Sequence, residues 1–225
     1  DAALSRSAYP IRDERNSENI SAQATYVNIA QGSWIQVYTA FYNHLGSAED
    51  IVNSLWKIRP AEPQYVFIHG KQVQIPRQQL AMGRCYTFSG QTSEAIEFEH
   101  PLVLKILGEM IQLTGAPFNG ALLNYYEGST QYIGPHSDDE RDLVKNMPIA
   151  VVSFGVPRRF RLTPKVECPS RKSYELMFSN GDVLIMGGTT QVTHKHEVRK
   201  PTKRGTSPSD YDGKRVSITF RVFSD

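Results

Sequence analysis

A histidine and an aspartate two positions apart are the residues of this chain best suited to bind a metal ion. His136 and Asp138 lie in the run Ile-Gly-Pro-His-Ser-Asp-Asp-Glu at 133–140. Side chains alternate faces along an extended segment, so residues i and i+2 leave it on the same face and their donor atoms can converge. An imidazole nitrogen and a carboxylate oxygen are two of the three ligands of a 2-His-1-carboxylate Fe(II) site, which leaves coordination positions open. The segment therefore predicts a metal site that needs one further histidine.

Two histidines further along are candidates for the third ligand. His194 and His196 follow the segment 181–188, Gly-Asp-Val-Leu-Ile-Met-Gly-Gly, whose apolar centre between glycines predicts a buried strand. The spacing alone does not choose between them. The tripeptide His136-Ser-Asp138 by itself is also compatible with an exposed turn, so the metal interpretation depends on the residues that accompany it.

A pair of arginines near the end of the chain predicts an anion site. Arg215 and Arg221 lie six positions apart in Arg-Val-Ser-Ile-Thr-Phe-Arg, an even spacing that places both on one face of a strand with Thr219 between them. Each guanidinium can bind a carboxylate through two parallel hydrogen bonds, so the pair can hold a dicarboxylate. Without the metal motif upstream, a half-buried strand with solvated ends would be the simpler interpretation.

These motifs together resemble the AlkB family of Fe(II)/2-oxoglutarate dioxygenases, and among its members those of eukaryotes that repair duplex DNA. The similarity covers roughly residues 60 to 225, with the motifs in the family's order. The matching segments are Ile75-Pro-Arg77, Tyr86-Thr-Phe-Ser-Gly90, Asn124-x-Tyr126, Ile133-x-x-His136-x-Asp138-Asp139-Glu140, 148–155, 181–188, Gln191, His196-Glu-Val198 and Arg215-x5-Arg221.

The resemblance implies an iron site and a co-substrate site. It assigns His136, Asp138 and His196 to Fe(II), because His196 alone keeps the family's distance to Val198, whereas His194 stands where the family carries a bulky aromatic residue. It assigns 2-oxoglutarate to five residues: Asn124, Tyr126, Arg215, Thr219 and Arg221. With O2, the implied reaction oxidises a methyl group on nitrogen and releases formaldehyde, succinate and CO2. Ser217 replaces an asparagine of many members, which would loosen the co-substrate site.

The resemblance also implies a pocket for an alkylated base such as 1-methyladenine or 3-methylcytosine. A base must leave the helical stack before an enzyme can act on it, and its pocket needs a flat partner and polar groups. Tyr86 and Phe88 would line the base, and Asp139 and Glu140 would bind its edge. Arg77 would contact the strand left without its partner, and His69 stands at the position of the family's phenylalanine wedge. Ordinary sheet packing is the alternative for Tyr86 and Phe88.

The elements that must position these residues are those of a mostly β protein with flanking helices (α+β) and a double-stranded β-helix, or jelly-roll, core. Short segments separated by Gly, Pro and Asp/Ser turns from Leu122 onward predict its strands. Helices are predicted from Ser47 to about Trp56 and from His100 to Gly115, the second with an apolar face of Leu102, Ile106, Met110 and Leu113. A hairpin is predicted over 65–75, and 26–45 is aromatic without a clear period.

The predicted organisation is a polar arm at 1–24 and a single dioxygenase domain at 25–225, with helices and substrate lid at 25–120 and the jelly-roll core at 121–225. The charge of +2 does not by itself indicate nucleic acid. Two basic stretches, at 158–172 and 195–204, are either solvated surface or a phosphate track. We expect the loop 200–214 to contact phosphates.

Composition limits the cellular setting. Two cysteines are too few for a disulfide framework, and no apolar run reaches membrane-spanning length. We therefore expect an intracellular protein, nuclear or cytoplasmic and not secreted. The resemblance implies that it acts on alkylated DNA, duplex or single-stranded, or on RNA, and we expect a monomer. Two alternatives stay open: a dioxygenase of the same fold acting on a protein or lipid, and a nucleic-acid-binding module without catalysis.

Overall fold

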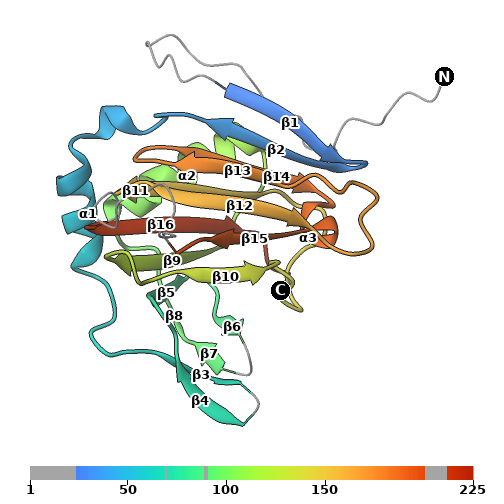
Figure 1. Cartoon of the computed structure of the whole chain (residues 1–225). Helices are drawn as coiled ribbons and strands as arrows, with labels where there is room; N and C mark the ends of the chain where they lie inside the picture. The colour runs from blue at the N-terminus through green and yellow to red at the C-terminus, as the bar shows by residue number, and fades with distance from the viewer. Residues whose placement is uncertain (1–23, 69, 89–90, 201–211, 225) are drawn as a thin grey trace.

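Two facing β-sheets form the body of the protein in the computed structural model, which describes residues 24–68, 70–88, 91–200 and 212–224 (Figure 1). The large sheet has eight strands in the order β1-β2-β14-β11-β16-β9-β5-β8. The smaller sheet has four, in the order β10-β15-β12-β13. In the large sheet the strands are β1 (Ala24–Ala30), β2 (Ser33–Tyr38), β14 (Val183–Gly188), β11 (Ile149–Gly155), β16 (Lys214–Arg221), β9 (Gly120–Glu127), β5 (Gln78–Met82) and β8 (Ala95–Ile96). In the small sheet they are β10 (Ile133–His136), β15 (His194–Val198), β12 (Arg158–Pro164) and β13 (Tyr174–Phe178).

The strand β16 divides its side chains between two environments. Val216, Ile218 and Phe220 belong to the larger apolar core, which they share with residues of both long helices. The intervening residues, from Arg215 to Arg221, line a cavity that also reaches residues of the small sheet. Period-two alternation therefore sends the apolar residues toward the helices and the polar residues toward the space between the sheets.

Two helices cover the outer face of the large sheet, and both start and stop as the sequence predicts. Helix α1 (Ala48–Trp56) is capped by Ser47, whose side chain accepts a hydrogen bond from the backbone N–H of Asp50 over 3.1 Å. Helix α2 (Pro101–Thr114) has Pro101 in its first turn and ends at Gly115, which has a φ of 72°. A left-handed residue at that position is the usual helix stop.

The buried face of α2 differs from the prediction. Ile106 and Met110 are buried as expected, but Val103 and Thr114 complete the buried stripe, and Leu102 and Leu113 are only partly buried. Apolar residues occupy both edges of this helix, so sequence alone could not fix its rotation to within one residue.

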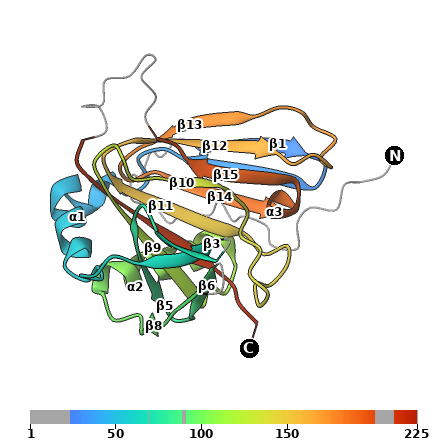
Figure 2. The ribbon, with the colours of Figure 1, turned by 60° about the horizontal axis from the view of Figure 1, so that its bottom comes forward.

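Two hairpins lie beyond the β5 and β8 side of the large sheet (Figure 1), the side that Figure 2 turns toward the viewer. The first joins β3 (Tyr65–Ile68) to β4 (Lys71–Gln74), as predicted for 65–75. The second joins β6 (Tyr86–Phe88) to β7 (Gln91–Ser93). His69 and the side chain of Phe88 lie outside the described residues, as do residues 1–23 and 201–211, which include most of the predicted arm and most of the basic loop.

The jelly-roll prediction is confirmed, and strands from both parts of the chain build it. The aromatic stretch at 26–45 forms β1, β2 and a short 3-10 helix at Asn43–Leu45. Strand β2 pairs with β14 over six residues, so the first strands extend the sheet of the later ones. Within the described residues, no helix is long and apolar enough to cross a membrane.

Candidate metal and co-substrate site

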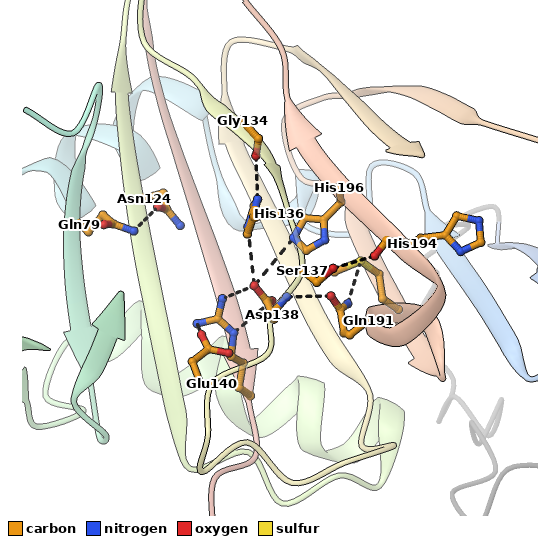
Figure 3. Close-up of polar contacts among 12 residues, drawn as sticks. Gln79, Asn124, Gly134, His136, Ser137, Asp138, Glu140, Gln191, His194 and His196 are labelled. Carbon is orange, nitrogen blue, oxygen red and sulfur yellow. Dashed lines mark hydrogen bonds and ion pairs between the residues drawn. The ribbon is translucent and has the colours of Figure 1, made fainter. Parts of the chain in front are cut away.

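Three predicted ligands meet beside β10, the edge strand of the small sheet. His136 on β10 and His196 on β15 are direct partners across the antiparallel pair, and Asp138 follows two residues after His136. The Nε2 atoms of His136 and His196 lie 3.7 and 3.9 Å from Asp138 Oδ1 (Figure 3). One potential ligand atom from each residue lies within 4.8 Å of the others, as binding to one ion requires. Two neutral imidazoles and one carboxylate form the donor set of a non-haem Fe(II) site.

Hydrogen bonding and burial prepare both imidazoles to act as ligands. The Nδ1 atom of His136 lies 2.9 Å from the carbonyl oxygen of Gly134, which can only accept, so Nδ1 carries the proton and Nε2 presents its lone pair. Burial lowers the pKa of His136, and burial together with His136 lowers the pKa of His196 to about 3. Both rings are therefore neutral at physiological pH.

Asp138 is ionised because Arg221 lies beside it. Burial alone would raise the pKa of this carboxyl, but Arg221 and then the two histidines outweigh burial and bring the pKa to about 2. The guanidinium contacts Asp138 Oδ1 at 2.9 Å and Oδ2 at 3.2 Å, and Glu140 Oε1 at 3.2 Å. Arg221 is thus already paired with two carboxylates, which leaves Arg215 as the arginine better placed to receive a ligand carboxylate.

His194 lies apart from this cluster, although it is buried. Its ring points away from Asp138 (Figure 3), and its Nδ1 lies 2.8 Å from Thr193 Oγ1. The structure therefore places His196 among the converging donors and leaves His194 outside, as the prediction preferred.

Two side chains that the prediction did not assign hold the metal-binding segment in place. Gln191, in the short helix α3 (Thr190–Thr193), accepts a hydrogen bond from the backbone N–H of Asp138 over 3.0 Å. The hydroxyl of Ser137 donates to the carbonyl oxygen of His194 over 2.9 Å. These two bonds fasten the segment after β10 to the start of β15, and thereby fix the two ligand-bearing strands relative to each other. The family resemblance marked Gln191 without giving it a role, and no pattern marked the contact of Ser137.

Arg215 offers an unused hydrogen-bond donor in a buried cavity. Its Nε donates to Ser153 Oγ over 3.1 Å, whereas its Nη1 is buried without a hydrogen-bond partner. Burial lowers the pKa of Arg215 to about 10, which still leaves the guanidinium charged. A buried charged donor without a partner is costly, so this atom is suited to an anionic ligand. The cavity, here called the inner cavity, is lined by Tyr86, Leu122, Asn124, Tyr126, Ile133, His136, Asp138, Val151, Phe160, His196, Val198, Arg215, Ser217, Thr219 and Arg221.

Arg77 lies inside the protein and not on the surface expected of a residue that contacts a nucleic-acid strand. Its side chain is buried, and its Nε donates to Asn124 Oδ1 over 2.8 Å. Gln79, which the prediction did not assign, donates to the same oxygen over 3.0 Å. The backbone N–H and carbonyl of Gln79 are in turn bonded by the side chain of Gln64, which fixes β5 at this point.

A larger cavity of about 770 Å³ opens beside the metal-binding residues and holds the predicted base-binding side chains. It is lined by Tyr86, Thr87, His136, Ser137, Asp139, Glu140, Arg141, Asp142 and Ser224. The ring of Tyr86 packs against Arg221, whose Cζ lies 5.3 Å from the ring centroid. Burial raises the pKa of Tyr86 to about 12, so its hydroxyl stays protonated. The wall at 139–142 supplies three acidic side chains, which suits a cationic substrate.

The basic stretch at 158–172 is not a continuous phosphate track. Arg158 is fully buried, and its Nη atoms donate to the carbonyl oxygens of Gly128, Gln131 and Arg199. Arg159 and Arg199 both pair with Glu175 on β13, at 2.7 and 3.2 Å. A run of basic residues in the sequence shows neither which face of β12 each arginine occupies nor which acidic residues lie on the neighbouring strand. The burial of Arg158 and the pairing of Arg159 with Glu175 could therefore not be predicted.

Comparisons with known proteins agree with this geometry. A model described as the 2OG-Fe(II) oxygenase superfamily matches residues 60–221. The chain is 34% identical over 164 residues to the mouse protein named DNA oxidative demethylase ALKBH2, covering 69% of this chain and 65% of that one. It is 35% identical to the human protein of the same name, covering 69% and 60%. It is 31% identical over 145 residues to bovine alpha-ketoglutarate-dependent dioxygenase alkB homolog 3, covering 61% and 48%.

A solved structure titled "The structure of OsALKBH1" shares the fold, with a TM-score of 0.58, 20% identity, and coverage of 88% of this chain and 99% of that one. The chain therefore belongs to the AlkB family of 2OG-Fe(II) oxygenases. The matches to the three curated relatives described above span between 48% and 65% of their lengths.

Proposed function

We propose that this protein oxidatively demethylates N-alkylated bases, such as 1-methyladenine and 3-methylcytosine, in nucleic acid. The convergence of His136, Asp138 and His196 beside a cavity of about 770 Å³ is the observation that carries the proposal. The family membership and the names of the relatives support it.

The residues of the site fit Fe(II) and 2-oxoglutarate. His136, Asp138 and His196 would hold the metal through neutral imidazoles and an ionised carboxylate, the donor set that suits Fe(II). The unpartnered Nη1 of Arg215 would bind one carboxylate of 2-oxoglutarate, assisted by Tyr126, Asn124 and Thr219 in the inner cavity. Arg221, already paired with Asp138, would mainly orient that ligand. Bound together with dioxygen, the metal and co-substrate would supply an oxidant able to hydroxylate a methyl group.

The chain's own residues would select and place the base. Tyr86, at the wall of the larger cavity, would pack on the base, with His136 at the opposite side. Asp139 and Glu140 would accept hydrogen bonds from the amine and stabilise the positive charge that methylation gives the ring. Phe88 and His69, which lie outside the described side chains, keep their predicted roles as a second base contact and a wedge. The hydroxymethyl product would break down to formaldehyde and the repaired base.

The substrate would be alkylated DNA, duplex or single-stranded, or RNA, and the protein would act as a monomer inside the cell, in the nucleus or the cytoplasm. The acidic cavity wall supports a methylated cation over a neutral protein or lipid side chain. The three converging ligand side chains support catalysis over a module that only binds nucleic acid.

One incubation tests the proposal. A 1-methyladenine oligonucleotide is combined with the protein, Fe(II), 2-oxoglutarate and air, and base masses and succinate are measured. We expect conversion to adenine with one succinate per base, and its loss in Asp138→Ala. Arg159→Met, a change at a half-exposed surface residue, is the matched control and should keep its activity. Succinate without a changed base would indicate another substrate class, and binding without either product would indicate a non-catalytic module.

A further inference from the structure

Arg77, which directly precedes β5, and Gln79, which lies in β5, hold the carboxamide of Asn124 in one orientation. Arg77 Nε and Gln79 Nε2 both approach the same amide atom, at 2.8 and 3.0 Å; Figure 3 draws the second bond. An arginine side chain has donors only, so the atom that faces Arg77 must be the amide oxygen. The amide nitrogen of Asn124 therefore points away from both residues.

That nitrogen is available to a ligand. Asn124 lines the inner cavity together with His136 and Arg215. Its Nδ2 has no hydrogen-bond partner among the residues that the structure describes, whereas its oxygen accepts two bonds. An amide with a saturated oxygen and a free N–H₂ group presents only donors to the cavity, which suits an anionic oxygen.

Arg77 adds a positive charge that lacks a carboxylate partner. The residue is only 6% exposed, and no carboxylate of the described part of the chain lies within ion-pair distance of its guanidinium. Arg215 is in the same situation, with 1% exposure. Burying a cation is costly unless an anion accompanies it. Arg215 lines the inner cavity and Arg77 lies behind Asn124, which also lines it, so both guanidiniums bring positive charge to the side of the cavity where an anionic ligand would bind.

We propose that Arg77 and Gln79 are positioning residues for 2-oxoglutarate, which act through Asn124 by turning its N–H₂ group toward a co-substrate carboxylate. Arg77 also supplies buried positive charge on that side of the cavity. The inference rests on the proposed function, and it gives Arg77 a role inside the site in place of contact with a nucleic-acid strand.

The test measures 2-oxoglutarate affinity apart from turnover. Calorimetry without dioxygen gives the Kd of 2-oxoglutarate for the Mn(II)-loaded protein. Gln79→Met keeps the side-chain length but removes one neutral donor, and should raise Kd about 3- to 10-fold. Arg77→Met removes a charged donor and should raise Kd at least about 10-fold. Gln78→Met is the matched control: Gln78 lies on the same strand but donates to Pro60, and its change should leave Kd within about twofold of wild type.

A double-mutant cycle separates positioning from general damage. If Gln79 acts through Asn124, then Gln79→Met in an Asn124→Ala background should change Kd by less than about twofold. The thermal unfolding midpoint of each variant without co-substrate checks folding. If Arg77→Met does not fold, the Gln79→Met variant and its double-mutant cycle with Asn124→Ala still test the proposal. Equal effects of Gln79→Met in both backgrounds would overturn the proposal.

Steady-state kinetics separate this inference from the proposed function. In Arg77→Met and in Gln79→Met, the KM for 2-oxoglutarate should rise while the KM for the methylated oligonucleotide stays near the wild-type value. If Arg77→Met weakens oligonucleotide binding and leaves 2-oxoglutarate affinity unchanged, Arg77 contacts the nucleic acid as first predicted, and its positioning role is overturned. Wild-type protein that neither binds 2-oxoglutarate nor demethylates would refute the proposed function itself.

Discussion

At the scale of single residues, the partners of a buried charge decide its role. Arg215 and Arg221 point into the same cavity, yet Arg221 contacts two carboxylates and Arg215 contacts none in the described part of the chain. The two guanidiniums are therefore not equivalent. Arg221 stabilises the ionised form of Asp138, and Arg215 retains an unpaired donor for a ligand.

Arg215→Met should therefore impair co-substrate binding more than folding. Loss of a charge-assisted hydrogen bond is expected to raise the KM for 2-oxoglutarate about 10- to 100-fold. Arg215→Lys should give an intermediate value, because it keeps the charge but loses the planar fork. The KM comes from succinate formation at saturating methylated oligonucleotide. A KM within twofold of wild type in Arg215→Met would contradict this assignment.

At the scale of elements, Arg158 links its own strand β12 to the loop before β10, a strand with which β12 does not pair directly. From β12 it reaches the loop before β10, at Gly128 and Gln131, and the end of β15, at Arg199. Strands β10 and β15 carry the two ligand histidines, so this side chain helps set the edge of the small sheet on which the site stands.

Arg158→Met should lower the free energy of unfolding by about 3 kcal/mol, because three partly buried carbonyl groups lose a charged donor. Arg159→Met, one residue along and half-exposed, should change it by less than about 1 kcal/mol. Denaturant titration followed by circular dichroism measures both. Equal destabilisation by the two changes would show that burial of Arg158 does not matter to stability.

A close approach between β14 and β2 gives a second prediction about an element. A Cβ atom on Gly187 would collide with the indole ring of Trp34. Gly187→Ala should therefore destabilise the protein by about 1–3 kcal/mol. On α2 a Cβ added to Gly108 would meet nothing within 4 Å, so Gly108→Ala should stabilise by about 0.5–1 kcal/mol. Thermal unfolding of the two variants should show midpoint shifts of opposite sign.

Elements with strong local signals were predictable, and contacts between distant segments were not. Ser47 and Gly115 fix helix ends through local chemistry, and the even spacing of Arg215 and Arg221 fixes a shared face. By contrast, β1 is exposed or partly buried except at Ile29, and β2 is buried over Ser33–Ile35 regardless of face, so neither strand shows clear alternation. The roles of Gln79, Gln191 and Arg158 depend on partners that only the tertiary fold supplies.

At the scale of the whole molecule, the net charge of +2 is too small to attract nucleic acid by itself. Binding must therefore depend on where the basic residues lie on the surface. The loop 200–214 carries Lys203 and Arg204 outside the described residues. Reversal of both to glutamate should weaken binding of an oligonucleotide at low salt and flatten the dependence of log K on log salt. Fluorescence anisotropy at several salt concentrations measures the slope, with Arg159→Met and Lys172→Met as surface controls. An unchanged slope would remove this loop from the interface.

The alternation along β16 also determines which kinds of genetic change the protein can tolerate. Arg215, Ser217, Thr219 and Arg221 lie toward the site only because each is separated from the next by one residue directed at the helices. Inserting or deleting a single codon between Val216 and Phe220 would reverse the facing of every later residue of the strand. Arg221 would then point into the apolar core and Phe220 into the inner cavity. Substitutions here remove one function at a time, whereas a length change would abolish chemistry and folding together.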